Sequence, residues 1–394
     1  MKRIGSIEKK LVKEVLRSEF RSSKATGMLA RAEEAFAPLG GSNHAIGCVN
    51  GTATLHIALE ALGVGAGDEV IVPALTMSAT CFSVLQANAT PIFADVDSKT
   101  WQIDPESIKR LITPRTKAIM TVALYGGAPD YDRIRAVAGQ IPLIEDNAES
   151  MGTTYKGELI GGIGAFSSYS FQSSKHLSAG EGGMLCTNGD VLAEEARLIQ
   201  TLGYAAVRNA QTRKIPKSVI QNPDYLRHES LGWNYRMPEL VAAVVLGQTL
   251  RARELSAARV RAAKELKEII GSVSWLTLQA EHEHVESSYW ALGATLERSD
   301  ISWADFTQRF RDHDGKGIYA AWALGYQEPA FQNQAFLGRQ RFLTRPAAEL
   351  FAAGTAPVAE ILQKKILAFR TNEWDPKGLA KQAKALKKTL SSFS

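Results

Sequence analysis

The chain has 394 residues, of which 45% are hydrophobic, and this is enough apolar material for a large core and suggests two domains. Its net charge of +5, from 46 basic and 41 acidic residues, is too mild to argue for nucleic acid. No run approaches the roughly 18 apolar residues of a membrane span, and the charged helical pattern of residues 1–20 is not a signal peptide. We therefore expect a cytoplasmic protein that binds neither nucleic acid nor membrane.

The cysteines and histidines give no sign of a metal site. Cys48, Cys81 and Cys186 lie among apolar or small residues and form no Cys-x-x-Cys pair, which is typical of buried reduced thiols in a reducing compartment. His282 and His284 fall in an acidic, polar stretch that we interpret as a surface loop.

From about residue 45 to residue 188, short apolar runs alternate with helical patterns. The runs rich in Val and Ile, interpreted as buried strands, are HAIGCV, EVIVPA, PIFADV, KAIMTVAL and IPLIED. The stretches between them, interpreted as helices, are TATLHIALEALG, TMSATCFSVLQAN, DPESIKRLI and DYDRIRAVAG. This alternation predicts an α/β fold in which a mostly parallel sheet has helices on both faces. Ligands of such sheets bind at the carboxyl ends of the strands.

The rest of the chain predicts a loop, a long helix and a smaller domain. AFSSYSF and MLCTN read as two more strands, and residues from about 192 to 222 are helical and then basic and polar, as in a long loop. One long helix is expected from near Met237 to residue 270. After about Gly271, strand-like segments (VSWLTL, SSYWALGATLE, KGIYAAWAL) and two helical ones predict a smaller α+β domain. We divide the chain into a large domain, residues 1–250 with the N-terminal helix, and a small C-terminal domain, residues 251–394.

Two motifs at predicted strand ends carry possible chemistry. Gly51 and Thr52 open a helix after the first strand, where free N–H groups and the helix dipole favour a phosphate; the alternative is a plain N-cap by Thr52. Asp146 and Glu149 follow the run IPLI within EDNAE, and carboxylates there are costly unless a metal or a cationic ligand pairs with them. The alternative is a helix N-cap by Asp146.

Two further motifs complete the set. Ser170 and Lys175 lie at the end of the strand AFSSYSF, before the glycine-rich turn of residues 180–183, where a lysine amine can act as a nucleophile. Asn234 lies in GWNYRMPE before the long helix; the alternative is a simple helix start with Pro238 near its first position. One ligand would satisfy all four motifs, because pyridoxal 5'-phosphate carries a phosphate, a ring cation and an aldehyde that captures lysine.

These motifs also resemble a known family. The order and spacing of NGTATLHIALEALGVGAGDEVIVP, ATPIFADVD, EDNAESMG, SFQSSKHLSAGEGG and GWNYRMPEL are similar to those of the DegT–StrS sugar aminotransferases, within the fold-type-I pyridoxal-phosphate enzymes. The likeness covers about Gly27 to Gln248. It implies an aspartate-aminotransferase-like large domain and a homodimer with active sites at the subunit interface.

The resemblance assigns a role to each site residue. Lys175 would hold the cofactor covalently and shuttle protons, Asp146 would pair with the pyridine nitrogen, and Glu149 would contact the ring's phenolic oxygen. The remaining cofactor-binding positions are Gly51, Thr52, Ala53 and Ser170 around the phosphate, Met77 against the ring, and Asn234 on the phosphate of the neighbouring subunit's cofactor.

Three departures from the family pattern bear on the site and the substrate. Met77 stands where many members have a stacked aromatic residue, although its sulfur can still pack there. Ala123 replaces a common histidine. The C-terminal segments GIYAAWALGYQEPAF and ILAFRTNEW lack the usual histidine and Leu-Pro signatures. The acceptor therefore stays open.

The predicted reaction moves an amino group from an amino acid, expected to be L-glutamate, to a carbonyl of a sugar, for amino-sugar biosynthesis such as that of lipopolysaccharide or another cell-surface polysaccharide. The acceptor could be nucleotide-linked, a free sugar or cyclitol, or an acidic sugar such as an oxo-octulosonate. Cations for an acid are available at Arg339, Arg341, Arg345 and Arg370.

Three alternatives remain. In a pyridoxal-phosphate sugar dehydratase the lysine is often replaced by His, whereas here His176 stands beside Lys175. A cofactor-binding regulator without turnover is a second. A nucleotide-binding dehydrogenase, the third, would need a Gly-x-Gly-x-x-Gly motif after the first strand, and that motif is absent.

Overall fold

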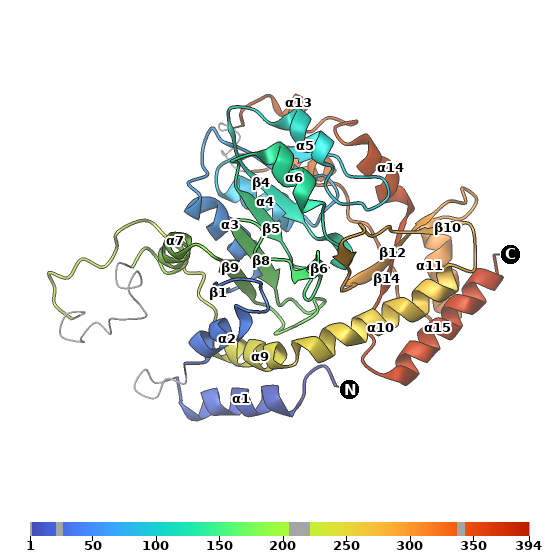
Figure 1. Cartoon of the computed structure of the whole chain (residues 1–394), viewed down its shortest axis with the longest axis horizontal. Helices are drawn as coiled ribbons and strands as arrows, with labels where there is room; N and C mark the ends of the chain where they lie inside the picture. Colours follow the sequence, from blue (N-terminus) through green and yellow to red (C-terminus); the bar gives the residue numbers. More distant parts are fainter. Residues whose placement is uncertain (1, 21–26, 205–220, 337–342, 394) are drawn as a thin grey trace.

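A computed structural model describes residues 2–20, 27–204, 221–336 and 343–393. Its centre is a seven-stranded sheet in the order β1-β9-β8-β5-β4-β2-β3 (Figure 1). The strands are β1 His44–Cys48, β2 Glu69–Pro73, β3 Thr90–Ala94, β4 Thr116–Val122, β5 Leu143–Asp146, β8 Phe166–Ser170 and β9 Gly183–Thr187. The pairs from β3 to β8 are parallel, and β9 runs antiparallel to both of its neighbours. The predicted mostly parallel sheet is confirmed.

Helices cover this sheet on both faces because its strands are apolar on both sides. They are α3 Gly51–Ala61, α4 Ala79–Gln86, α5 Pro105–Leu111, α6 Tyr131–Ala138 and α7 Asp190–Gln200. On the N-terminal side, α1 Ser6–Arg17 and α2 Met28–Phe36 pack against α9 Glu239–Leu250. Figure 1 shows α1 lying along α9 at the rim of the molecule.

The helix expected from Met237 to residue 270 is two helices. The first, α9, ends at Leu250, and the second, α10, spans Ala252–Ile270. Arg251 separates them with φ −110° and ψ 8°, outside the helical range, and its guanidinium bonds to the buried Glu8 carboxylate at 2.8 Å. Figure 1 shows α10 continuing toward the C-terminal sheet.

The C-terminal part is built on a second, antiparallel sheet in the order β10-β12-β14-β13. Its strands are β10 Leu276–Leu278, β12 Ala291–Leu296, β13 Tyr319–Ala320 and β14 Ile366–Arg370. Of the helices in this part of the chain, α11 Trp303–Asp312 packs on α15 Pro376–Ser391, and α14 Pro357–Lys365 contacts β12. The short helices α12 Pro329–Gln332 and α13 Ala347–Leu350 lie instead beside β3 of the large sheet. The expected smaller α+β unit is present, and the division at residue 250 stays a prediction.

Smaller elements complete the fold. A three-stranded sheet, β11-β6-β7, joins β6 Thr154–Tyr155, β7 Glu158–Leu159 and β11 Val285–Glu286, and two 3₁₀ turns span Leu124–Gly126 (η2) and Gly325–Gln327 (η4). Most of the predicted basic loop, residues 205–220, lies outside the described residues. Among the described helices, none is long and apolar enough to cross a membrane.

The topology gathers the chemically interesting loops at one edge of the large sheet. Strands β1, β2, β4, β5 and β8 share one direction, so the segments that follow them leave from the same edge. Strand β9 runs the other way and begins at that edge. An alanine Cβ at Gly183, its first residue, would lie 2.4 Å from the carbonyl oxygen of Asn50, so only glycine allows the two segments to pack this closely.

Candidate active site

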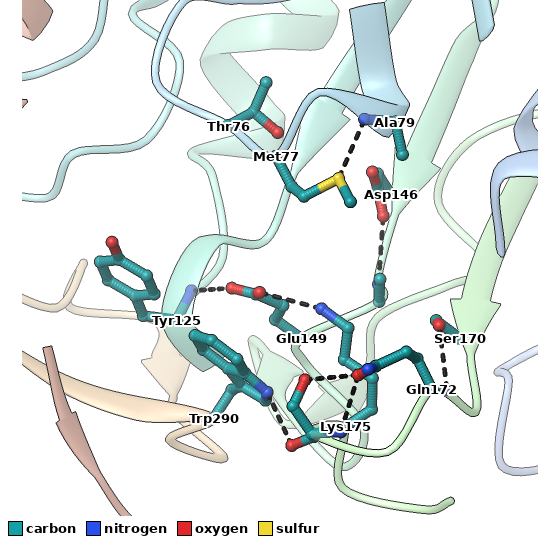
Figure 2. A network of polar contacts seen from close by, with 12 residues as sticks. Thr76, Met77, Ala79, Tyr125, Asp146, Glu149, Ser170, Gln172, Lys175 and Trp290 are labelled. Carbon is teal, nitrogen blue, oxygen red and sulfur yellow. Dashed lines mark hydrogen bonds and ion pairs between the residues drawn. The ribbon is translucent and has the colours of Figure 1, made fainter. Parts of the chain in front are cut away.

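Lys175 and Glu149 form an ion pair inside this edge (Figure 2). Lys175 follows β8, and its Nζ donates to Glu149 Oε1 at 3.0 Å. The two side chains are only 12% and 5% exposed. Their carboxylate and amine are thus largely shielded from water, which strengthens the interaction and holds the amine in one place. The loop lysine singled out in the sequence is therefore held in place within a buried site.

Glu149 is held from its other side by Tyr125. The backbone N–H of Tyr125 donates to Glu149 Oε2 at 3.1 Å. Tyr125 has φ 59°, a left-handed conformation that few non-glycine residues adopt, and it lies in the turn after β4. The carboxylate thus spans two donors, the N–H of Tyr125 and the amine of Lys175.

Trp290 closes the site from the small sheet. Its ring stacks on Tyr125 with centroids 5.9 Å apart, and the Lys175 Nζ lies 5.0 Å from the ring centroid. Its indole N–H donates to the carbonyl of Ser174 at 3.0 Å. Figure 2 shows Trp290 beside Lys175 and Tyr125, so one residue that precedes β12 contacts two loops of the large sheet.

Asp146 is a buried carboxylate at the end of β5. It accepts from the Thr80 hydroxyl at 2.9 Å and from the N–H of Ala148 at 3.2 Å. Burial raises the pKa of Asp146, partly offset by these hydrogen bonds. The N-cap alternative for Asp146 is wrong, because a turn follows it and no helix begins there. Its carboxylate is placed to pair with a cationic ligand.

Glu145, the neighbouring acid, serves a different purpose. Adjacent strand residues point to opposite faces, so Glu145 faces away from Asp146. It accepts from the N–H groups of Gly161, Ile163 and Gly164 at 3.0, 2.9 and 2.6 Å and holds that loop. The described residues contain no group of three acids, histidines or cysteines that could hold a metal, so the metal alternative for this motif finds no support in them.

The start of α3 lies close to the end of β8, beside Ser170. The N-cap is Asn50 rather than Thr52, and its side chain accepts from Ala53 N–H at 2.8 Å. An alanine Cβ at Gly51 would lie 3.0 Å from the Cβ of Ser170, so glycine keeps the space beside Ser170 open. The first N–H groups of a helix have no intrahelical partner. The Asn50 side chain accepts the N–H of Ala53, so the N–H groups of Gly51 and Thr52 remain for a ligand.

Two predicted cofactor residues lie at the edge of this group. Met77 is 44% exposed, and its sulfur accepts from the N–H of Ala79 at 3.0 Å (Figure 2). Asn234 is exposed and pairs with Thr201, in the segment whose Tyr235 carbonyl accepts from Val49 N–H at 2.9 Å. Asn234 therefore lies beside the end of β1 and outside the Lys175–Glu149 pair, and its contact with a neighbouring subunit's cofactor stays a prediction.

The sequence pattern did not reveal Tyr125, Trp290 or Arg259, which all contact the Lys175 site. Tyr125 and Trp290 reach it through tertiary packing, and no local pattern marks them. Arg259 did leave a signal, since it falls on the buried stripe of α10 between Leu255 and Leu266.

Comparison with known proteins places the chain in a family. The sequence model of the DegT/DnrJ/EryC1/StrS aminotransferase family matches residues 2–350. The chain belongs to this family. It is 29% identical to an aminotransferase from Psychrobacter cryohalolentis, whose X-ray structure superposes with a TM-score of 0.85 over 99% of this chain and 98% of that one. The predicted family and aspartate-aminotransferase-like fold are confirmed.

Two curated relatives share part of the chain. A GDP-perosamine synthase of Caulobacter vibrioides is 43% identical over 231 residues, which cover 58% of each protein. A protein of Geobacillus stearothermophilus named as a pleiotropic regulatory protein is 41% identical over 207 residues, which cover 52% of this chain and 51% of that one. The chain thus spans between half and three-fifths of these relatives. The family to which the chain belongs is one of aminotransferases, in agreement with the predicted enzyme class.

Proposed function

We propose that this protein transfers the amino group of L-glutamate to a carbonyl of a sugar, with pyridoxal 5'-phosphate as cofactor. The observation that carries the proposal is the buried Lys175 amine, 3.0 Å from Glu149, in the same loop cluster as Asp146 and the start of α3. When bound, the cofactor supplies an aldehyde that captures amines and a ring that acts as an electron sink.

The site's own groups fit the three handles of this cofactor. Within the described ranges, the buried Asp146 carboxylate has only a hydroxyl and an N–H as hydrogen-bond partners, so it can keep a ring nitrogen protonated. The space that Gly51 leaves beside Ser170 suits a phosphate. Lys175 would hold the aldehyde carbon and, in each half-reaction, would move a proton between the bound substrate's carbon and the cofactor, while Glu149 fixes the position of its amine.

A row of aromatic rings beside the lysine supports the proposal that the amino acceptor is a sugar. Trp290 stacks on Tyr319 with centroids 5.7 Å apart, and Tyr319 is 39% exposed. The Arg370 guanidinium lies 5.8 Å from the Tyr319 centroid, and within the described chain it has an amide, Asn372, but no carboxylate as partner. A sugar ring on this row of aromatic rings with an anionic group at Arg370 fits this arrangement.

Of the two described arginines that could serve an acidic acceptor, Arg370 is better placed than Arg345. Arg345 lies 4.0 Å from the buried Glu69, next to β2 and away from the Lys175 loop, and Arg339 and Arg341 lie outside the described residues. The GDP-perosamine synthase relative supports a nucleotide-linked keto-sugar, whose phosphates would be the anionic group. A role in amino-sugar biosynthesis for a cell-surface polysaccharide such as lipopolysaccharide follows from that acceptor.

The dehydratase alternative is disfavoured by the geometry of His176. This ring is buried beside Lys175 but turns away, and its Nε2 meets the carbonyl of Ser288 at 3.1 Å. The lysine remains the residue that faces Glu149. The regulator alternative is supported by the name of the Geobacillus relative, and it predicts cofactor binding without turnover.

We also propose a homodimer in the cytoplasm. Leu226 and Leu231 are each 86% exposed on the segment that leads to Asn234, and burying such side chains against a second copy would stabilise it. In Figure 1 this segment extends away from the body of the molecule. The three cysteines are free and buried, as a reducing compartment allows.

The test is a turnover assay with defined donors and acceptors. We expect L-glutamate and a GDP-linked keto-sugar to give one 2-oxoglutarate for each amino-sugar formed, and Arg370→Met to raise the KM for that acceptor at little cost in kcat. Arg345→Met is the matched control. Binding of the cofactor without reaction with any amino donor would replace the proposal with the regulator, and release of water from the sugar without amination would replace it with the dehydratase.

A further inference from the structure

Arg259 is a buried arginine that joins three segments around Lys175. It lies on α10, is 1% exposed, and donates to the carbonyls of Ser174 at 2.6 Å and Lys175 at 2.9 Å. Its other arm donates to the carbonyl of Trp290 at 2.8 Å and to the hydroxyl of Thr371 at 3.2 Å. The lysine loop is thereby tied to both β12 and the end of β14.

Arg3 holds the same loop from the N-terminus of the chain. Its guanidinium donates to the carbonyl of Lys175 at 2.5 Å and to that of Ser173. The segment that carries it is anchored in turn, because Gln248 and Arg251 donate to the Arg3 carbonyl at 2.9 and 3.1 Å. The carbonyls of residues 173, 174 and 175 are therefore all held by arginine side chains.

Trp374 connects the two arginines. Its ring lies 5.5 Å from the guanidinium of Arg3 and 5.5 Å from that of Arg259. Cations over an indole are attracted to its face, and the attraction is larger where water is excluded. The two like charges thus share one aromatic partner beside the lysine loop.

This arrangement is electrostatically expensive. Among the residues described here, neither Arg3 nor Arg259 has a carboxylate within ion-pair distance. Burial and the charge of Arg3 lower the pKa of Arg259 to about 9, and the more distant charge of Glu149 offsets only part of this. Buried charges normally need a counter-ion or full hydrogen bonding. Here the hydrogen bonds to backbone carbonyls offset part of the cost of burying the arginines. The same hydrogen bonds fix the position of the lysine loop.

We propose that Arg3 and Arg259 are positioning residues that fix the backbone of Lys175 so that its amine meets Glu149, and that Arg3 therefore serves the active site from the segment before α1. The inference rests on the proposed role of Lys175 as the cofactor lysine. When Arg3 is removed, water replaces it at the Ser173 carbonyl, and the Lys175 carbonyl keeps the hydrogen bond from Arg259 but loses the one from Arg3. The lysine side chain then samples other positions. A small displacement of a reacting group lowers a rate on the order of ten- to a hundredfold.

The first measurement is hydrogen exchange of the protein freed of cofactor, which does not depend on the proposed function. The amides of Lys175 and Ala179 bond to the carbonyls of Gln172 and Phe171 at 3.0 and 2.9 Å. In Arg3→Ala we expect at least about tenfold faster exchange in this loop, because its opening costs less free energy. Lys2→Ala, at the exposed neighbour, is the matched control and should leave the loop unchanged.

The second measurement is the rate at which each variant captures added pyridoxal phosphate, followed by its absorbance. We expect Arg3→Ala to be about tenfold slower than Lys2→Ala, and added guanidinium, below denaturing concentrations, to restore part of the rate. Arg259→Lys, which keeps the charge but loses the planar fork, should be slower as well. Restoration by guanidinium distinguishes positioning from a general loss of structure.

Two results would overturn the proposal. One is faster exchange confined to residues 2–20 with the lysine loop as protected as in Lys2→Ala, which would mean that Arg3 only anchors the N-terminus. The other is a faster-exchanging loop with an unchanged capture rate. If the unaltered protein captured no pyridoxal phosphate at all, the proposed function would fail, whereas the exchange result would still decide whether the arginines hold the loop.

Discussion

Glu149→Ala should destabilise the protein because it removes the carboxylate from between two mostly buried donors. The Lys175 ammonium, 12% exposed, and the N–H of Tyr125 would both lose this acceptor. Breaking a buried ion pair costs roughly 3–5 kcal/mol, and because both side chains keep a small exposed fraction we expect a loss near the lower end, about 3 kcal/mol. Glu149→Gln keeps one oxygen for one of the two donors, so we expect about 1–2 kcal/mol.

The assay is urea unfolding of protein freed of cofactor, since a bound cofactor would add its own binding free energy. Glu283→Ala is the control, because that carboxylate is 78% exposed and its pairing with His284 should be worth less than about 0.5 kcal/mol. Equal losses for Glu149→Ala and Glu283→Ala would refute the idea that this carboxylate holds the lysine.

Three more predictions concern single residues. Gly51→Ala puts a Cβ 3.0 Å from that of Ser170, so we expect the Kd for pyridoxal phosphate to rise at least about tenfold. Gly65→Ala adds a Cβ in open space and is the neutral control. An unchanged Kd in Gly51→Ala would argue against a phosphate site at the start of α3. Asp146→Asn should bind the cofactor but react with glutamate on the order of a hundredfold more slowly in single-turnover absorbance traces, and an unchanged rate would remove Asp146 from the ring nitrogen. Burial lowers the pKa of His176 well below its ordinary value, so the unfolded chain binds the extra proton first and stability falls as the pH drops below about 6.5. Relative to His176→Gln, the unaltered protein should therefore lose up to about 1.4 kcal/mol per pH unit in that range in urea unfolding, and parallel pH curves for the two proteins would contradict this.

Most of the large sheet could be predicted because strands such as β2, β3 and β4 are short apolar runs buried on both faces, whereas β8, FSSYS, alternates in polarity. The break at Arg251 could not, because a helical pattern continues through it and the interruption depends on contacts with Glu8 and the N-terminal segment. Strand β14 was also missed, since ILAFRTNEW was weighed for substrate signatures and its pairing with β12 is a tertiary fact.

The site shows the same division between local and tertiary information. Lys175, Asp146, Glu149 and the start of α3 follow strand ends, and parallel strands bring such ends together, so the motifs could be predicted to meet. Trp290 reaches the lysine from the second sheet. The contacts of Arg3 with the same loop connect the two ends of a long stretch of chain, and a single sequence carries no record of such proximity.

The visible absorption spectrum of the purified protein with pyridoxal phosphate, before and after L-glutamate, tests the central claim most directly. We predict a yellow band that fades when glutamate is added and that is absent from Lys175→Ala, because the Lys175 amine is the group that holds the aldehyde. A yellow band of equal strength in Lys175→Ala, or no band in the unaltered protein, would contradict the assignment of Lys175 as the cofactor lysine.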